Sequence, residues 1–254
     1  MREKFEMKTV KSEIENKIRD KKNRVGAVIL AGGQGKRMNS QVQKQYMMLA
    51  GRPLISYALE AFEYSPVDEI VLVVGPGEEE YARREILGPL GLKKVTDVVP
   101  GGKERYHSVY QGLKALEGCG YVLIHDGARP LVTEDIIERA ICGAMEEGAC
   151  VVGKPVKDTI KVSDAQGYAA DTPDRSRLWQ IQTPQAFSYA LVRLAYDRLM
   201  EDESLQSGIT DDAMVVETCT SERVKLVEGS YENIKVTTPE DLVLADALLK
   251  MRRQ

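Results

Sequence analysis

Two positively charged residues follow a glycine-rich loop near the start of the chain, and together they indicate phosphate chemistry. The apolar run Val28–Leu30 leads into Ala-Gly-Gly-Gln-Gly at residues 31–35, and Arg37 and Lys44 follow. Glycines let backbone N–H groups approach an anion without interference from a Cβ atom, and nearby cations neutralise its charge. We therefore expect the loop to hold a phosphate group. A glycine turn beside solvated cations is the plainer alternative.

Two common phosphate-binding motifs do not fit this loop. A dinucleotide fingerprint needs GxGxxG, but Met38 occupies the third glycine position, and the next apolar run, at residues 71–74, ends in Gly75 rather than an acidic residue. A P-loop needs Ser or Thr after its Gly-Lys pair, and here Arg37 follows, with Leu30 at the first glycine position. What remains is a loop with Arg and Lys at its exit, which is typical of nucleotidyltransferases that bind a nucleoside triphosphate.

A carboxylate at the end of a later strand is a candidate metal ligand. Asp126 follows the apolar run Tyr121–Ile124, so it stands at a strand's carboxyl end, where open α/β sheets bind ligands. One such carboxylate can hold Mg²⁺ against triphosphate oxygens. His125 is either a ligand or base, or a structural hydrogen-bonding residue. With only two histidines, the chain has no His/Cys cluster that would indicate zinc.

Two further segments bring polar residues to the ends of expected strands. Gly101-Gly102 leads into a helix that carries Arg105 and Ser108 on its first turns. Backbone donors at such a helix start suit a base, ribose or phosphate, although the pattern also fits an ordinary strand-to-helix turn. Lys235 lies between Ile and Val on a short apolar segment. A lone lysine usually lies on the solvated surface, and the apolar neighbours are an argument for the alternative, a side chain that points into a cleft.

Apolar runs alternate with helical patterns from Val25 onward, which predicts an α/β fold with a mainly parallel, twisted sheet flanked by helices on both faces. Strands are expected at Val25–Leu30, Glu69–Val74, Lys94–Val98, Tyr121–Ile124 and Ala149–Val152. Helices are expected at Pro53–Tyr64, Glu78–Leu87, Glu104–Leu116 and Thr133–Glu147, and others start near Thr210 and Thr238.

The chain divides into an extension, one domain and an insertion. Residues 1–24 form a densely charged N-terminal extension to which we assign no chemistry, and residues 25–254 form one nucleotidyltransferase domain. Within it, residues 155–178 break the strand–helix rhythm with prolines, a glycine and many charges. We expect this insertion to project as a β-arm that pairs with a partner subunit, with a plain surface loop as the alternative.

Composition excludes several classes of function. With a net charge of −4 over 254 residues, the chain lacks the basic surface that nucleic-acid binding requires. Its four cysteines show no CxxC spacing, which indicates reduced thiols and a cytoplasmic protein. No apolar run approaches the ~20 residues needed to span a bilayer, and the N-terminus has no features of a signal peptide. We expect neither a nucleic-acid partner nor a membrane partner.

Taken together, these motifs resemble the cytidylyltransferase family of the non-mevalonate isoprenoid pathway, which makes CDP-methylerythritol from CTP and 2-C-methyl-D-erythritol 4-phosphate (MEP). The resemblance covers residues 25–251. It is carried by LAGGQGKRM, KQY, GGKERYHS, HDGARP, PVKDTIK, LWQIQTPQ, TDDA and NIKVTTPED. It implies a Rossmann-like nucleotidyltransferase fold, a Mg²⁺ cofactor and a homodimer in which the β-arm is exchanged.

The resemblance also implies a role for each matching residue. The catalytic residues would be Arg37, Lys44, Arg175 and Lys235, with Arg37 and Lys44 stabilising the transition state at the CTP α-phosphorus. Asp126 would hold Mg²⁺. The CTP site would consist of Ala31, Gly32, Gly33, Gly35, Gly102, Arg105, Ser108, Asp126, Gly127 and Arg129. MEP would be bound by Thr159, Arg175, Thr210, Glu232 and Lys235, with Thr159 and Arg175 serving the partner's site.

Three positions depart from the family pattern, and two other functions compete. Gln43 stands where proline is frequent, Lys103 where an acidic residue is common, and Glu232 where Asp is usual. None of these changes removes a phosphate-binding cation. A ribitol-5-phosphate cytidylyltransferase would share the loop and the arm, whereas a non-catalytic nucleotide-sensing module would not need all four cations.

No Ser/His/Asp arrangement is expected, since the attacking phosphate oxygen is already ionised.

Overall fold

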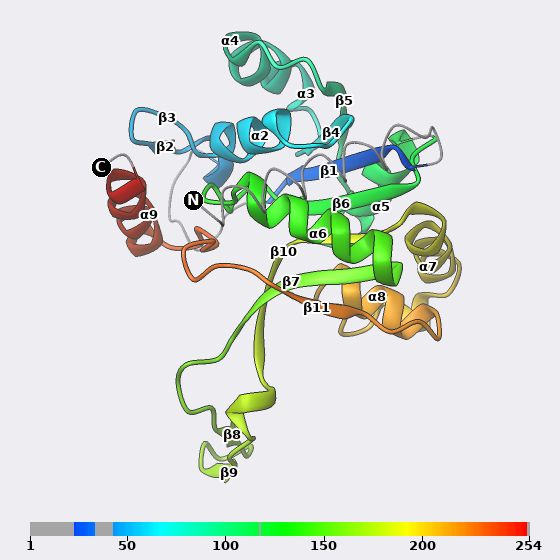
Figure 1. Ribbon diagram of the computed structural model, residues 1–254, viewed down its shortest axis with the longest axis vertical. Helices are drawn as coiled ribbons and strands as arrows, with labels where there is room; N and C mark the ends of the chain where they lie inside the picture. Colours follow the sequence, from blue (N-terminus) through cyan, green and yellow to red (C-terminus); the bar gives the residue numbers. More distant parts are fainter. Residues whose placement is uncertain (1–22, 34–42, 117, 253–254) are drawn as a thin grey trace, which may run out of the picture.

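The computed structural model describes residues 23–33, 43–116 and 118–252, and within them the backbone alone at residue 44. A seven-stranded sheet runs through the molecule in the order β11-β7-β10-β6-β1-β4-β5 (Figure 1). All neighbouring strands are parallel except β10, which is antiparallel to β6 and β7. The strands are β1 (Val25–Ala31), β4 (Glu69–Val74), β5 (Val95–Pro100), β6 (Tyr121–Asp126), β7 (Ala149–Pro155), β10 (Trp179–Ser188) and β11 (Lys225–Glu228).

Helices cover both faces of the sheet and are joined to it by short turns (Figure 1). They are α2 (Leu54–Tyr64), α3 (Glu79–Tyr81), α4 (Gly88–Leu90), α5 (Arg105–Ala115), α6 (Glu134–Glu147), α7 (Tyr189–Glu201), α8 (Asp212–Cys219) and α9 (Pro239–Arg252). A π-helical turn, η4 (Ala82–Leu87), joins α3 to α4, and 3₁₀ turns lie at η3 (Lys44–Tyr46), η5 (Arg175–Arg177) and η6 (Glu203–Gln206). Two short strands, β2 (Met48–Leu49) and β3 (Arg52–Pro53), form a separate hairpin.

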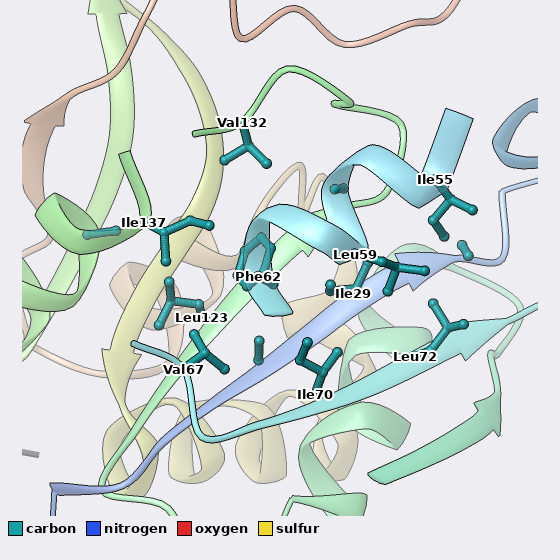
Figure 2. Close-up of a cluster of buried hydrophobic side chains, with 14 of the residues drawn as sticks. Ile29, Ile55, Leu59, Phe62, Val67, Ile70, Leu72, Leu123, Val132 and Ile137 are labelled. Carbon is teal, nitrogen blue, oxygen red and sulfur yellow. The ribbon is translucent and has the colours of Figure 1, made fainter. Parts of the chain in front are cut away.

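Alternation of side chains along the strands explains why the sheet needs helices on both sides. In β4, Ile70 and Leu72 belong to one buried cluster, while Val71 and Val73 belong to the other. Successive strand residues point to opposite faces, so an all-apolar strand must be covered on both. Figure 2 shows the first cluster, in which α2 presents Phe62 and its neighbours to β1 and β4. The second cluster packs α5, α7 and α8 on the opposite face.

The order of the strands creates a ligand-binding position at the end of β1. The chain passes from β1 to β4 and β5 on one side, then returns to place β6 on the other side of β1. Leu30 is level with Asp126 of β6, and Ala31 is level with Val74 of β4. Connections that diverge from one strand leave a crevice at its carboxyl end, and open α/β sheets bind ligands there.

The segment between β7 and β10 projects away from the sheet (Figure 1). Pro155 of β7 pairs with Trp179 of β10, and beyond this pair the chain continues to the small hairpin of β8 (Val162–Ser163) and β9 (Ala169–Asp171). The side chains at 157–172 are exposed. In this structure the arm therefore has few packing contacts with the domain from which it emerges.

The predicted fold class is confirmed, with local differences. The helix expected at Glu78–Leu87 is divided by the π-helical turn and continues to Leu90. The strand expected at Lys94–Val98 begins at Val95 and extends to Pro100. No helix in the described ranges is long and apolar enough to cross a membrane.

Candidate active site

A cavity of about 240 Å³ opens at the crevice between the strand ends, beside β6 and β10. Its lining combines three cations with two carboxylates and several amide or hydroxyl groups. The lining residues are Arg105, Asp126, Arg129, Ile181, Gln182, Thr183, Gln185, Thr210, Asp211 and Lys235. Five of the site residues predicted from the sequence therefore line this cavity: Arg105, Asp126, Arg129, Thr210 and Lys235.

Asp126 is the central acidic group of the cavity. It is the last residue of β6, its backbone N–H donates to Thr183 Oγ1, and its side chain is 11% exposed. Lys235 Nζ lies 2.6 Å from its Oδ2, and Arg105 Nε lies 3.3 Å from its Oδ1. Burial by itself would raise the pKa of Asp126, but the positive charges of Arg105, Lys235 and Arg129 outweigh it and hold that pKa well below its usual range. Asp126 is therefore a carboxylate at neutral pH.

Arg105 is fixed at the first position of α5. Glu104 caps this helix together with His107, in a reciprocal arrangement that satisfies N–H groups at the helix start. The Arg105 guanidinium makes two parallel hydrogen bonds of 2.8 Å to the carboxylate of Asp212. Such paired bonds fix both the direction and the plane of the guanidinium. Its position is thus determined from two sides, by the turn of α5 and by Asp212.

Arg129 is a third cation at the cavity, and backbone oxygens hold it. Its Nη1 donates to the carbonyl oxygen of Asn233 at 2.8 Å, and its Nη2 donates to that of Ile181 at 3.4 Å. The side chain is almost completely buried, and its Nε has no hydrogen-bond partner. Burial and the nearby Arg105 lower the pKa of Arg129, against the opposing effect of Asp126. Because carbonyl dipoles do not neutralise its charge, Arg129 is suited to attract an anion.

His125 has a structural role. It is fully buried, its Nδ1 lies 3.0 Å from Thr183 Oγ1, and its Nε2 lies 3.3 Å from the carbonyl oxygen of Arg129. Burial lowers the pKa of His125 to about 4, so the ring is neutral at physiological pH. Both nitrogens are engaged inside the protein, and the ring does not line the cavity. Of the two interpretations of this residue, the structure supports the hydrogen-bonding one.

The glycine turns beside the cavity are tightly packed. Gly127 donates its N–H to the carbonyl oxygen of Leu30, and a Cβ atom at Gly127 would lie 2.9 Å from that oxygen. Gly102 donates to Ser108 Oγ at 3.0 Å, so these two predicted CTP-site residues contact each other across the β5–α5 turn. Ala31 and Gly32 follow at the end of β1, where Gly32 packs against the backbone of Val74 and Gly33 is exposed.

Three of the five residues predicted to bind MEP do not line this cavity. Thr159 and Arg175 are exposed on the projecting arm, where Arg175 Nη1 donates to the carbonyl oxygen of Lys157. Glu232 forms an ion pair with Arg252 of α9, with 2.9 Å between Oε2 and Nε. Arg37, Gly35 and the side chain of Lys44 fall outside the described residues, so their assignments stay predictions.

The structure adds residues that sequence reasoning did not single out. Asp212 is fully buried and binds Arg105, and Tyr196 donates its hydroxyl to Asp212 Oδ1 at 2.5 Å. Gln185 joins the N-terminus of α8 to β10 through Asp211 and the N–H of Ala213. The run Thr210-Asp211-Asp212 was visible as a helix start, but its acidic residues had no local sign of a charged partner.

A mostly parallel sheet with cations gathered around one carboxylate at its switch point defines a nucleotidyltransferase of Rossmann-like architecture. The chain belongs to the 2-C-methyl-D-erythritol 4-phosphate cytidylyltransferase family, whose model matches residues 25–251.

Similar proteins agree with this membership. The 2-C-methyl-D-erythritol 4-phosphate cytidylyltransferase of Lachnoclostridium phytofermentans is 50% identical over 227 residues, which is 89% of this chain and 97% of that protein. The one of Lachnospira eligens is 52% identical over 88% of this chain and 98% of its own length. Among solved structures, the 4-diphosphocytidyl-2C-methyl-D-erythritol synthase of Anaerococcus prevotii superposes with a TM-score of 0.78 at 33% identity, over 90% of this chain and 97% of that one. The Thermus thermophilus cytidylyltransferase gives a TM-score of 0.72 at 31% identity, over 89% and 99%.

Proposed function

We propose that the cavity beside β6 and β10 is where this chain transfers CMP from CTP to MEP, releasing pyrophosphate. Family membership supplies the reaction. The single observation that carries the assignment of the site is the convergence of Arg105, Arg129 and Lys235 around Asp126 at the switch point of the sheet. Such a set of fixed charges suits a polyanionic substrate.

The reaction needs positioning and charge stabilisation more than proton transfer. An oxygen of the MEP phosphate attacks the α-phosphorus of CTP, the bond from that phosphorus to the bridging oxygen breaks, and pyrophosphate leaves with the electron pair. Because the attacking oxygen is already ionised at neutral pH, no general base is required, which fits the internal role of His125. The chain's contribution is in-line placement and neutralisation of the developing charge.

The cations divide between the two substrates in our proposal. Arg105 and Arg129, with Ser108, the glycines at 32, 33, 35, 102 and 127, and Ala31, would hold CTP. Lys235 and Thr210, which line the cavity, would hold MEP. The resemblance implies that Glu232, which pairs with Arg252 outside the lining, would join them. Arg37 and Lys44 would stabilise charge at the α-phosphorus, as the resemblance implies.

A Mg²⁺ ion fits this site through Asp126. Mg²⁺ commonly takes only one or two protein carboxylates and completes its shell with phosphate oxygens and water. Asp126 is ionised and lines the cavity, and no group of three or more His, Cys, Asp or Glu residues in the described parts of the chain offers another metal site. When bound, Mg²⁺ would neutralise charge on the triphosphate oxygens. The residue that we propose to hold it is Asp126.

We further propose a cytoplasmic homodimer in which each arm reaches the partner's cavity. Thr159 and Arg175 are exposed on the arm, and exposed apolar side chains, including Ile160, Val162 and Tyr168, accompany them. Apolar groups together with an exposed guanidinium are features of a surface that binds another protein. None of the four cysteines, all of which lie in the described residues, is joined in a disulfide bond, which fits a reducing compartment.

The test of this function is an assay of the purified full-length chain with CTP, Mg²⁺ and either MEP or ribitol 5-phosphate. We expect CDP-methylerythritol and pyrophosphate to form in equal amounts. The first product is measured by ³¹P NMR and the second by a pyrophosphate-release assay. Faster turnover of ribitol 5-phosphate would contradict the substrate assignment. CTP binding with no turnover of either alcohol phosphate would support the nucleotide-sensing alternative instead.

A further inference from the structure

A chain of buried hydrogen bonds runs from the helix layer to the cavity. Tyr196, in the middle of α7, donates its hydroxyl to Asp212 Oδ1, and Asp212 accepts two bonds from Arg105. Arg105 in turn donates from Nε to Asp126. Tyr196 and Asp212 are both fully buried, and neither lines the cavity. The hydrogen bonds of these two side chains connect them to the cavity lining through Arg105.

The distances show which carboxylate controls Arg105. Both terminal nitrogens of the guanidinium lie 2.8 Å from Asp212 oxygens, whereas its contact with Asp126 is a single one of 3.3 Å. Charge-assisted bonds in a parallel pair are shorter and stronger than single ones. Asp212 therefore determines the guanidinium plane, and Asp126 is left with lone pairs that Arg105 does not saturate.

The surroundings of Asp212 and Tyr196 favour the hydrogen bond between them. Asp212 is the first residue of α8, where the helix dipole favours a negative charge, and the neighbouring Asp211 caps the helix through Met214 N. Burial and the Asp212 carboxylate raise the pKa of Tyr196 well above its usual value, so its hydroxyl stays a donor. The Tyr196 hydroxyl is thus the donor in its hydrogen bond to Asp212 at neutral pH.

We propose that Asp212 and Tyr196 are positioning residues for CTP: they hold Arg105 in the orientation in which it binds the nucleotide and prevent it from collapsing onto Asp126. The inference rests on the proposed CTP role of Arg105. It extends the site into the α7–α8 layer, which has no direct contact with the cavity through these two side chains. If Asp212 lost its second acceptor oxygen, the guanidinium would be released to pair more closely with Asp126.

The test combines three variants with a matched control. Asp212→Asn replaces one acceptor by a donor, Tyr196→Phe removes only a hydroxyl, and Arg105→Lys abolishes the paired bonds. Tyr110→Phe is the control, since it removes a Tyr-to-Asp bond between α5 and α7, to Asp197, that involves neither Arg105 nor a residue lining the cavity. Calorimetric titration with CTP and Mg²⁺ gives the affinity, steady-state kinetics give KM and kcat, and thermal melting reports folding.

We expect Asp212→Asn to weaken CTP binding about tenfold and Tyr196→Phe about threefold, with KM for MEP nearly unchanged and Tyr110→Phe like the parent. Combining Asp212→Asn with Arg105→Lys should weaken CTP binding no more than Arg105→Lys alone, because both changes remove the same pair of bonds. A purely structural role would instead lower kcat and the melting temperature without a selective rise in KM for CTP.

Two results would overturn the inference, and they can be told apart. Unchanged CTP affinity in Asp212→Asn and Tyr196→Phe, or additive losses in the double variant, would refute positioning while leaving the CTP role of Arg105 intact. If Arg105→Lys itself binds CTP like the parent, the assignment of Arg105 is wrong, and the positioning role is wrong with it. Tyr196→Phe keeps the aromatic ring in the core, so it remains informative if Asp212→Asn does not fold.

Discussion

Lys235 Nζ lies 2.6 Å from Asp126 Oδ2, so the segment that leads into α9 is ion-paired to the end of the central strand β6. The Lys235 side chain is 39% exposed and the Asp126 side chain 11%, so the pair stands at the wall of the cavity and not deep in the core. Val236 N donates to the carbonyl oxygen of Ala128, which fixes the register of the two segments. In our proposal Asp126 binds the metal ion and Lys235 binds MEP.

Replacing Lys235 by Ala should reduce kcat much more than it reduces stability. Removing one charged contact to a transition state typically raises the barrier by about 2.7–4 kcal/mol, which is roughly a 10²- to 10³-fold loss of kcat. Lys250→Ala is the control, since it removes a surface lysine that pairs with Asp246 on α9. Steady-state kinetics with both substrates measure the effect, and parent-like kcat in Lys235→Ala would remove Lys235 from the catalytic set.

The free energy of unfolding should decrease as the pH is lowered, because of His125. Its pKa is about 4 in the folded chain and about 6.5 when unfolded, so between these values the unfolded state binds more protons. This contribution to stability is fully present above pH 6.5 and is lost as the pH falls toward 4. The loss near pH 4 is about 3 kcal/mol. Urea unfolding at pH 7.5 and pH 5 checks the sign.

The comparison variant for that measurement is His125→Gln, which lacks the titrating ring. It should be less stable than the parent at pH 7.5 and show a smaller change between the two pH values. Asp126 does not contribute to the change in stability between pH 7.5 and pH 5, because its ordinary pKa of 3.8 lies below this range and its pKa in the folded chain is lower still. An equal pH dependence in both proteins would show that another group is responsible.

Gly127→Ala should damage both folding and the site. The added Cβ would lie 2.9 Å from the Leu30 carbonyl oxygen and 3.0 Å from Ile55 Cδ1, so the turn that follows Asp126 must move. Overpacking of this kind typically costs about 1–3 kcal/mol. Gly88→Ala in α4, where the nearest atom to the new Cβ would be 3.4 Å away, should be close to neutral. Thermal melting and CTP titration of both variants provide the comparison.

Mixing two inactive variants should restore activity if arms are exchanged. Arg175→Ala carries its defect in the arm and Lys235→Ala in the cavity, so a mixed dimer would contain one intact site. With random exchange of subunits, about a quarter of all sites would be functional. Mixing Lys235→Ala with Asp126→Asn should restore nothing, because both defects lie in the same cavity. Absence of rescue after mass spectrometry has confirmed mixed dimers would contradict the exchanged arm.

The elements that could be predicted from sequence are those whose apolar pattern is complete by itself. β4 was predicted with its observed bounds, and Thr133 caps α6 by accepting a bond from Ile136 N. β6 continues two residues beyond its predicted end. The prediction stopped early because His125 and Asp126 are polar, although both are buried in the fold. The sequence pattern cannot show that Thr183 and Lys235 will satisfy them.

β10 and the Asp212 contact could not be predicted for the same reason. Within β10, Gln182 and Gln185 interrupt the apolar alternation, and they are buried because Ser230 and Asp211 bind them. Arg105 and Asp212 are 107 residues apart in the chain, so no local spacing connects them. Polar residues that depend on distant partners look like loop residues until the tertiary structure is known.

The pairing of Pro155 with Trp179 gives the molecule a modular boundary. On one side of that pair lies a sheet whose strands need no residue from 156–178 to complete their register, and on the other lies a hairpin that pairs only with itself. The register of the main sheet and, in our proposal, the assembly of subunits are thereby encoded in separate segments of the chain. The arm can be lengthened or excised at this boundary without changing a strand pairing of the main sheet, and under our proposal such a change would alter how subunits recognise each other.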